Sequence, residues 1–136
     1  MIIQTLLSYN EWSLAALRII LGIIFLAHGW PKIKNLRQTA SMFAAMGFKP
    51  GALWGTIAAV VEFFGGLGLL LGFYTQAYAA LLVIQMLVAT IWKMRAGQKL
   101  SGGYELDLLL VAALLTVTTA GPGMYALDNY LSQLQY

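Results

Sequence analysis

The stretch that most constrains this sequence is the apolar run from Leu53 to Leu71, which carries one carboxylate, Glu62, near its middle. The run is long enough to cross a bilayer as one helix, which needs about 20 apolar residues. A charged side chain at that depth costs on the order of 3 kcal/mol on insertion scales, so it normally faces a bundle interior and has a partner. The residues that share its helical face are mostly small, namely Gly55, Ala58, Ala59, Gly65 and Gly66, followed by Leu69. The sequence therefore predicts that another helix packs closely beside Glu62.

The composition places the whole chain in a membrane. Of its 136 residues, 60% are hydrophobic and 10% are charged, with a mean hydropathy of +0.77, whereas a soluble domain carries about 25% charged residues. The chain has no cysteine, which excludes thiol chemistry. Its net charge of +3 is small and does not indicate a nucleic-acid partner. The lipid bilayer is the partner that the composition implies.

Four apolar runs predict membrane-spanning helices over about 12–30, 53–72, 75–92 and 104–120. Pro31 is expected to end the first helix. The short gap between the second and third helices makes them antiparallel neighbours. Asn35 followed by Gln38 resembles a capping box, so a short interfacial helix is expected in the first connection, and another in the C-terminal tail. We predict an all-α fold, a single transmembrane domain over residues 1–136 built as an antiparallel four-helix bundle with short interfacial helices.

The basic residues predict the orientation of the bundle. All eight Lys and Arg residues except Arg18 fall in the connections 31–53 and 93–103. The positive-inside rule puts both connections in the cytoplasm and both termini outside.

Arg18, inside the first predicted span, is the expected partner of Glu62. At 1.5 Å per residue, Arg18 lies roughly 18 Å from Trp30 and Glu62 roughly 12 Å from Trp54, counted from the same side of the membrane, and an arginine side chain bridges the difference. We predict a structural ion pair between Arg18 and Glu62. Two roles stay open for it: fixing the helix register, or forming a polar pocket near the midplane that holds the polar head of a small ligand.

Two further polar side chains are predicted to face the cytoplasmic half of the same interior. Glu105 lies on the most polar face of the fourth span, and His28 lies at its level. The sequence thus predicts a ligand-binding pocket bounded by Arg18, His28, Glu62 and Glu105. In the alternative, Glu105 pairs with Lys32 or Lys93 at the interface and the interior is closed.

The sequence has no motif for metal binding, nucleophilic catalysis or nucleotide binding. The chain has no His-x-x-His or Glu-x-x-His pair, so we predict no metal site. It has no nucleophile with a base and no nucleotide-binding glycine loop, and its catalytic residues stay unknown. Asp107 is expected to compensate the helix dipole in the first turn of its span.

Four motifs occur in a fixed order: Leu17-Arg18-Ile19 in a helix ending at His28-Gly29-Trp30-Pro31-Lys32, then Glu62-Phe63-Phe64-Gly65-Gly66, Gly102-Gly103-Tyr104-Glu105-Leu106, and Gly121-Pro122-Gly123. In this order and spacing, from about Leu14 to Asp128, the chain resembles the DoxX family of small four-span membrane proteins. The resemblance matches Arg18, Glu62, Glu105 and Lys32 to ionisable residues of that family. It implies the four-span fold and a multi-pass location in the plasma (inner) membrane of a prokaryote, whereas an activity does not follow from a fold.

The family takes its name from a subunit linked to a thiosulfate:quinone oxidoreductase and terminal quinol oxidase, and other members are described as membrane partners of redox or detoxifying enzymes. The first hypothesis is therefore an accessory oxidoreductase subunit that binds a quinone or another small lipid-soluble ligand, with Trp54, Phe63 and Phe64 as apolar walls. The chain has no cysteine and no haem ligand pair, so a soluble or membrane redox protein would carry the electrons. A quinone is the one cofactor considered, and whether the chain is an enzyme or a homo-oligomer stays open.

The alternative is a non-catalytic membrane scaffold or assembly factor that docks another protein on its basic face. A third hypothesis is a small-molecule or proton path along the same polar groups.

Overall fold

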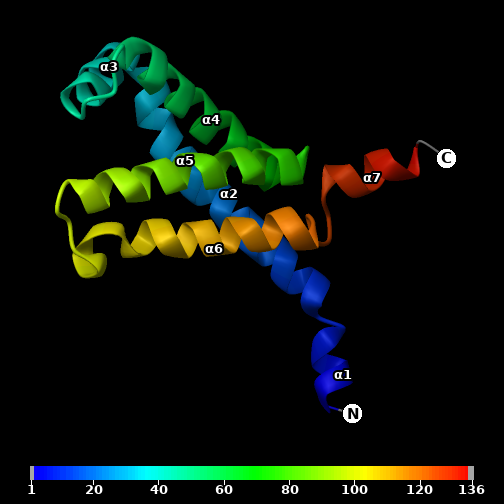
Figure 1. Cartoon of the computed structure of the whole chain (residues 1–136). Helices are drawn as coiled ribbons and strands as arrows, with labels where there is room; N and C mark the ends of the chain where they lie inside the picture. The colour runs from blue at the N-terminus through cyan, green and yellow to red at the C-terminus, as the bar shows by residue number, and fades with distance from the viewer. Residues whose placement is uncertain (1, 135–136) are drawn as a thin grey trace.

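The computed structural model describes residues 2–134, and all regular structure within them is helical (Figure 1). Four helices are long and apolar enough to cross a membrane, which confirms the predicted all-α fold with four spans. They are centred on α2 (Asn10–Lys34), α4 (Gly51–Leu71), α5 (Thr75–Arg95) and α6 (Glu105–Ala120), where the first span runs from Ile2 to Lys34 and the fourth from Leu100 to Ala120. Three short helices, α1 (Ile2–Leu7), α3 (Leu36–Ala45) and α7 (Leu127–Gln133), and a helical turn, η1 (Leu100–Tyr104), complete the order. Residue 1 and residues 135–136 of the predicted domain lie outside the described part.

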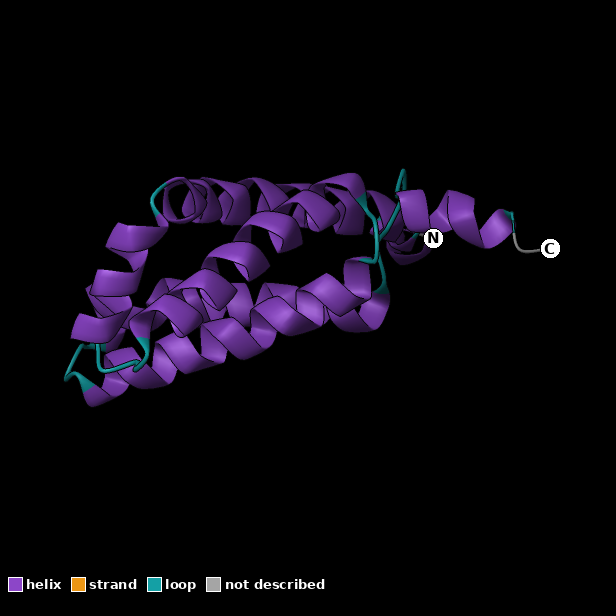
Figure 2. Ribbon diagram, turned by 90° about the horizontal axis from the view of Figure 1, so that it is seen from above, coloured by secondary structure: helices purple, strands orange, loops and turns teal. Residues whose placement is uncertain are grey.

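The irregular connections gather at the two ends of the bundle (Figure 2). We call the end that carries α3 and the two basic connections the α3 end, and the opposite end the α7 end. The segment after α6 lies against the start of α2, because the Met124 amide donates a hydrogen bond to the Glu11 carbonyl (3.3 Å).

Glycines hold α2 and α4 in close contact where they cross. A Cβ atom on Gly29 would lie 2.6 Å from the backbone nitrogen of Phe63, and one on Gly66 would lie 2.6 Å from the backbone nitrogen of Leu26. No side chain fits in such a space, so the two backbones touch directly. Gly66, which belongs to the small face predicted around Glu62, is therefore a point at which α4 packs directly on α2.

α4 and α5 form the antiparallel pair that the short gap predicts. Gly72 ends α4 with φ +70, a conformation that suits glycine. Next to this turn the two helices are close, because Gly65 lies against the Leu82 side chain and Gly68 against Tyr78. Beyond it α5 lies beside α6 (Figure 1), and both helices contribute to the buried core.

The sequence predicted that α2 ends at Pro31, but the helix continues to Lys34. Proline removes only one intrahelical donor, and the following segment supports the extra turn. The Asn35 amide donates to the Pro31 carbonyl (3.2 Å), and the Thr39 hydroxyl donates to the Lys32 carbonyl (3.0 Å). The consequence is that Lys32 belongs to a helical face and not to a loop.

α3 begins where the capping pattern predicts. The Asn35 side chain accepts a hydrogen bond from the Gln38 amide (3.1 Å). α3 then packs on the first turns of α4, where a Cβ atom on Gly51 would fall among the backbone atoms of Ala40 and Ala44. The two helices therefore form one closely packed wall at the α3 end.

Candidate ligand cavity

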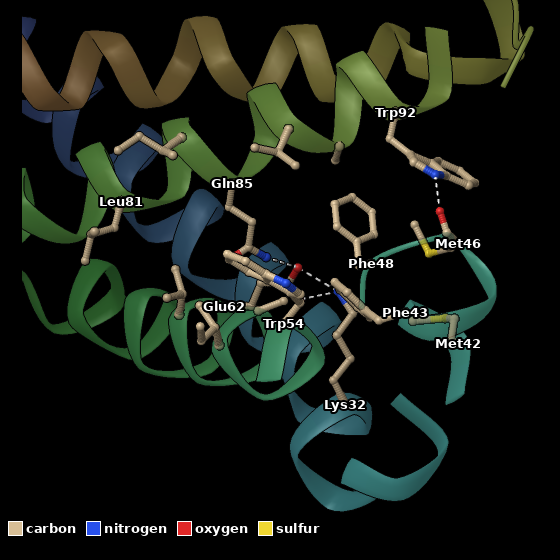
Figure 3. Close-up of a pocket in the computed structure, with 16 residues that line it drawn as sticks. Lys32, Met42, Phe43, Met46, Phe48, Trp54, Glu62, Leu81, Gln85 and Trp92 are labelled. Atoms are coloured by element: carbon tan, nitrogen blue, oxygen red, sulfur yellow. Dashed lines mark hydrogen bonds and ion pairs between the residues drawn. The ribbon is translucent and has the colours of Figure 1, made fainter. Parts of the chain in front are cut away.

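A cavity of about 590 Å³ lies between α4 and α5 and is closed towards the α3 end by α3 and the loop after it (Figure 3). Its walls are apolar and aromatic, with Phe43 and Phe48 on one side, Trp54 on α4 and Trp92 on α5. The Trp92 indole nitrogen donates a hydrogen bond to the Met46 carbonyl (2.9 Å), which joins the loop to α5.

The cavity opens on the surface of the bundle that faces lipid. Trp54 and Ile84, which line it from opposite helices, are 45% and 61% exposed. An apolar molecule in the bilayer can therefore reach the cavity sideways, without passing through water.

One corner of the cavity is polar and consists of Glu62, Lys32 and Gln85 (Figure 3). The Lys32 ammonium lies 2.6 Å from Oε1 and 2.5 Å from Oε2 of Glu62. The side-chain amide of Gln85 donates a second hydrogen bond to Oε1 of Glu62 (2.5 Å). Glu62 itself is only 6% exposed, so it is a buried carboxylate with partners on two neighbouring helices.

Close helix contacts explain why these three side chains meet. Gly29 lies against the backbone at Glu62 and Phe63, and Lys32 follows Gly29 by three positions on the same face of α2. Gly65 lies against Leu82; Glu62 comes three positions before Gly65, and Gln85 comes three positions after Leu82. Because α4 and α5 are antiparallel, these two offsets bring Glu62 and Gln85 to the same level.

The predicted ion pair between Arg18 and Glu62 is wrong. Arg18 is buried, and its guanidinium donates to main-chain carbonyls: those of Leu69 and Leu70 at the end of α4 (2.8 and 3.0 Å) and, in the segment after α6, those of Pro122 and Met124 (2.8 and 3.1 Å). The last carbonyls of a helix lack intrahelical donors and carry partial negative charge, so they attract a cation. Arg18 therefore belongs to the α7 end and closes it.

His28 and Glu105 do not line the cavity either. His28 precedes Gly29, so when Gly29 faces α4 the histidine points away, and it is exposed. Glu105 is exposed at the start of α6 and accepts a hydrogen bond from the Gly102 amide (3.0 Å), which makes it a local cap of that turn. Phe63 and Phe64, expected as walls, pack on each other and lie outside the cavity, whereas Trp54 lines it as expected.

A second ion pair lies at the α3 end, between α5 and α6. The Lys93 ammonium lies 3.0 and 2.8 Å from the two carboxylate oxygens of Asp107, which is 4% exposed. Lys93 thus pairs with Asp107, and not with Glu105 as the alternative held. Within residues 2–134 no three His, Asp or Glu side chains come together as a metal site would require.

The sequence reasoning missed Lys32 and Gln85 as members of the site. Lys32 was considered only as an interfacial partner of Glu105, and the helix before it was expected to end at Pro31. Gln85 is the one strongly polar side chain in the middle of the third span, and that signal was present in the sequence. A polar side chain at this depth needs a partner, and Glu62 is one.

These features define an integral membrane protein with four spans and a cavity, open to lipid, around a buried ion pair. The family model that matches the chain is DoxX, over residues 13–95, and the chain belongs to this family. Its relatives include the inner membrane protein YqjF of Escherichia coli, 29% identical over 85% of this chain and 89% of its own length. An uncharacterized protein of Haemophilus influenzae is 32% identical over 89% of this chain and 92% of its own length. A Bacillus subtilis protein named "Putative oxidoreductase CatD" is 28% identical over 85% of this chain and 84% of its own length. No solved structure matches the chain significantly.

Proposed function

We propose that this protein binds a quinone or a similar lipid-soluble molecule with a polar head in the cavity between α4 and α5, and that it works with a redox partner. The observation that carries the proposal is the combination of a cavity of about 590 Å³, apolar walls and a single polar corner at Glu62. Sites for small molecules are typically mostly apolar, within about 300–1,000 Å³, with a few polar groups that orient the ligand.

The position of the cavity also supports a ligand drawn from the bilayer. The polar corner lies at the middle of α4, and the walls extend from it towards the α3 end. A ring with polar substituents fits beside Glu62, Lys32 and Gln85, while a hydrocarbon tail leaves through the opening into lipid. The name of the Bacillus subtilis relative supports a link to oxidoreduction. In this arrangement the chain holds the ligand, and electrons come from the partner.

The experiment is the quinone content of the protein purified in a mild detergent from its native membrane. We expect near-stoichiometric quinone with the wild type and a several-fold loss with Val88→Trp, because Val88 lines the cavity and a larger side chain there fills it. Leu87→Trp is the matched control, since Leu87 is the adjacent exposed residue of α5 and does not line the cavity.

Equal quinone content in both variants contradicts the proposal. The same holds if the wild type copurifies with no quinone and binds none when it is added. The non-catalytic scaffold, docking a protein on the basic connections, then takes its place.

A further inference from the structure

The polar corner of the cavity holds two opposite charges that cancel. The Lys32 ammonium contacts both oxygens of Glu62, at 2.6 and 2.5 Å. Among the described residues that line the cavity, these two are the only ones with charged side chains. A ligand that enters therefore meets a site with no net charge.

The same corner keeps hydrogen-bonding capacity for a ligand. An ammonium group has three N–H donors, and Lys32 directs two of them at Glu62. Gln85 donates to Glu62 through its amide nitrogen, while its carbonyl oxygen accepts no hydrogen bond from the described residues. The cavity therefore offers a head group one N–H donor from Lys32 and one carbonyl acceptor from Gln85.

A charged head group would disturb this balance. Glu62 is 6% exposed, so an anionic head beside it would be a second buried anion that competes for Lys32. A cationic head would compete with Lys32 for Glu62 in the same way. A buried charge without a partner of its own is costly, because it loses its water and gains no compensating interaction.

We infer that the Lys32–Glu62 pair makes the site specific for a neutral head group with carbonyl or hydroxyl oxygens, and that it excludes amphiphiles with an anionic or cationic head. This inference rests on the proposed function, since it assumes that the cavity holds a lipid-soluble ligand. It assigns the selection to the ion pair, while Gln85 positions Glu62 and contacts the head.

The test measures the binding of three probes with similar tails: decyl-benzoquinone, dodecyl phosphate and dodecylamine. Quenching of tryptophan fluorescence reports the quinone, because Trp54 and Trp92 line the cavity. The charged probes are measured by competition against it. We expect the wild type to prefer the quinone by about tenfold or more over either charged probe.

Charge variants then test the cause of the preference. Glu62→Gln leaves Lys32 alone and should gain binding of dodecyl phosphate, whereas Lys32→Gln leaves Glu62 alone and should gain binding of dodecylamine. The double variant Lys32→Gln/Glu62→Gln restores a neutral corner and should bind the quinone and reject both charged probes. Because it leaves no lone charge, it serves where a single variant fails to fold. Lys34→Gln, at an exposed position outside the cavity, should change none of these affinities.

The outcomes separate this inference from the proposed function. If the wild type binds a charged probe as tightly as the quinone, the specificity is wrong and the cavity remains a ligand site. If the double variant prefers a charged probe, the ion pair is not the selecting feature. If no probe binds the wild type, both the proposed function and the inference fall.

Discussion

Lys32, in the last turn of α2, neutralises Glu62 at the middle of α4, 30 positions further along the chain. The contact joins two helices whose backbones already touch at Gly29. It also forms the polar corner of the cavity. The same pair therefore contributes to the packing of the bundle and to the chemistry of the site.

The first prediction concerns the coupling of this pair. Glu62→Gln and Lys32→Gln should each lower the free energy of unfolding by about 1–3 kcal/mol, because each leaves a charge without its partner. The double variant should lose less than the sum of the two single losses. Thermal unfolding in detergent measures all three, with Lys34→Gln as the control. Additive losses would mean that the two side chains do not interact.

The second prediction concerns Arg18. Arg18→Lys should weaken the α7 end nearly as much as Arg18→Gln, because an ammonium has fewer donors than a guanidinium and cannot reach the same carbonyls of α4 and of segment 121–126. A cysteine placed at buried Ala126 measures this, since its alkylation should become faster in both variants. Arg37→Gln, at an exposed position, is the control. Unchanged alkylation in Arg18→Gln would contradict the structural role.

The third prediction concerns the contact between α2 and α4. Gly29→Ala and Gly66→Ala should each destabilise the protein by about 1–3 kcal/mol, because the added methyl group meets backbone that cannot move aside. Gly103→Ala is the control: its nearest neighbour would be the Gln98 side chain at 3.2 Å, in a loop. In thermal unfolding, the melting temperature of Gly103→Ala should be well above those of Gly29→Ala and Gly66→Ala. Equal stability of all three variants would refute the close contact.

The fourth prediction concerns orientation in the membrane. Single cysteines at Gln38, Gln98 and Gln133 are exposed, and the chain has no cysteine of its own. An impermeant thiol reagent applied to intact cells should label position 133 and leave positions 38 and 98 unlabelled, because basic connections stay in the cytoplasm. Labelling of all three after lysis is the control. The reverse pattern would invert the proposed topology.

The sequence predicted the elements of this fold better than their side-chain contacts. The apolar run Leu53–Leu71 predicts a span, and the small residues around Glu62 mark positions where α2, α3 and α5 pack closely on α4. Helical spacing depends only on residues close in the sequence, so it can be predicted without knowing how the helices pack. The cap at Asn35 was predictable for the same reason.

The partner of Glu62 was not predictable by counting depth. Residue counts put Arg18 and Glu62 within reach, but they cannot show that the carbonyls of Leu69 and of the segment after α6 compete for the guanidinium. Nor could they show that α2 continues past Pro31, which turns Lys32 towards α4. The first error comes from contacts between distant segments, which hydropathy and local spacing do not encode. The second comes from the hydrogen bonds of Asn35 and Thr39, which support the extra turn of α2 after Pro31.

Arg18 at the α7 end and the Lys93–Asp107 pair at the α3 end bracket the cavity without belonging to it. Polar contacts outside the cavity therefore hold the helices together on either side of the polar corner. Lys32, Glu62 and Gln85 can therefore be replaced together while the contacts of Arg18 and of Lys93 with Asp107 remain. The residues of the candidate ligand site and the residues that close the two ends of the bundle are thus separate sets, so the chemistry of the cavity can be redesigned on an unchanged fold.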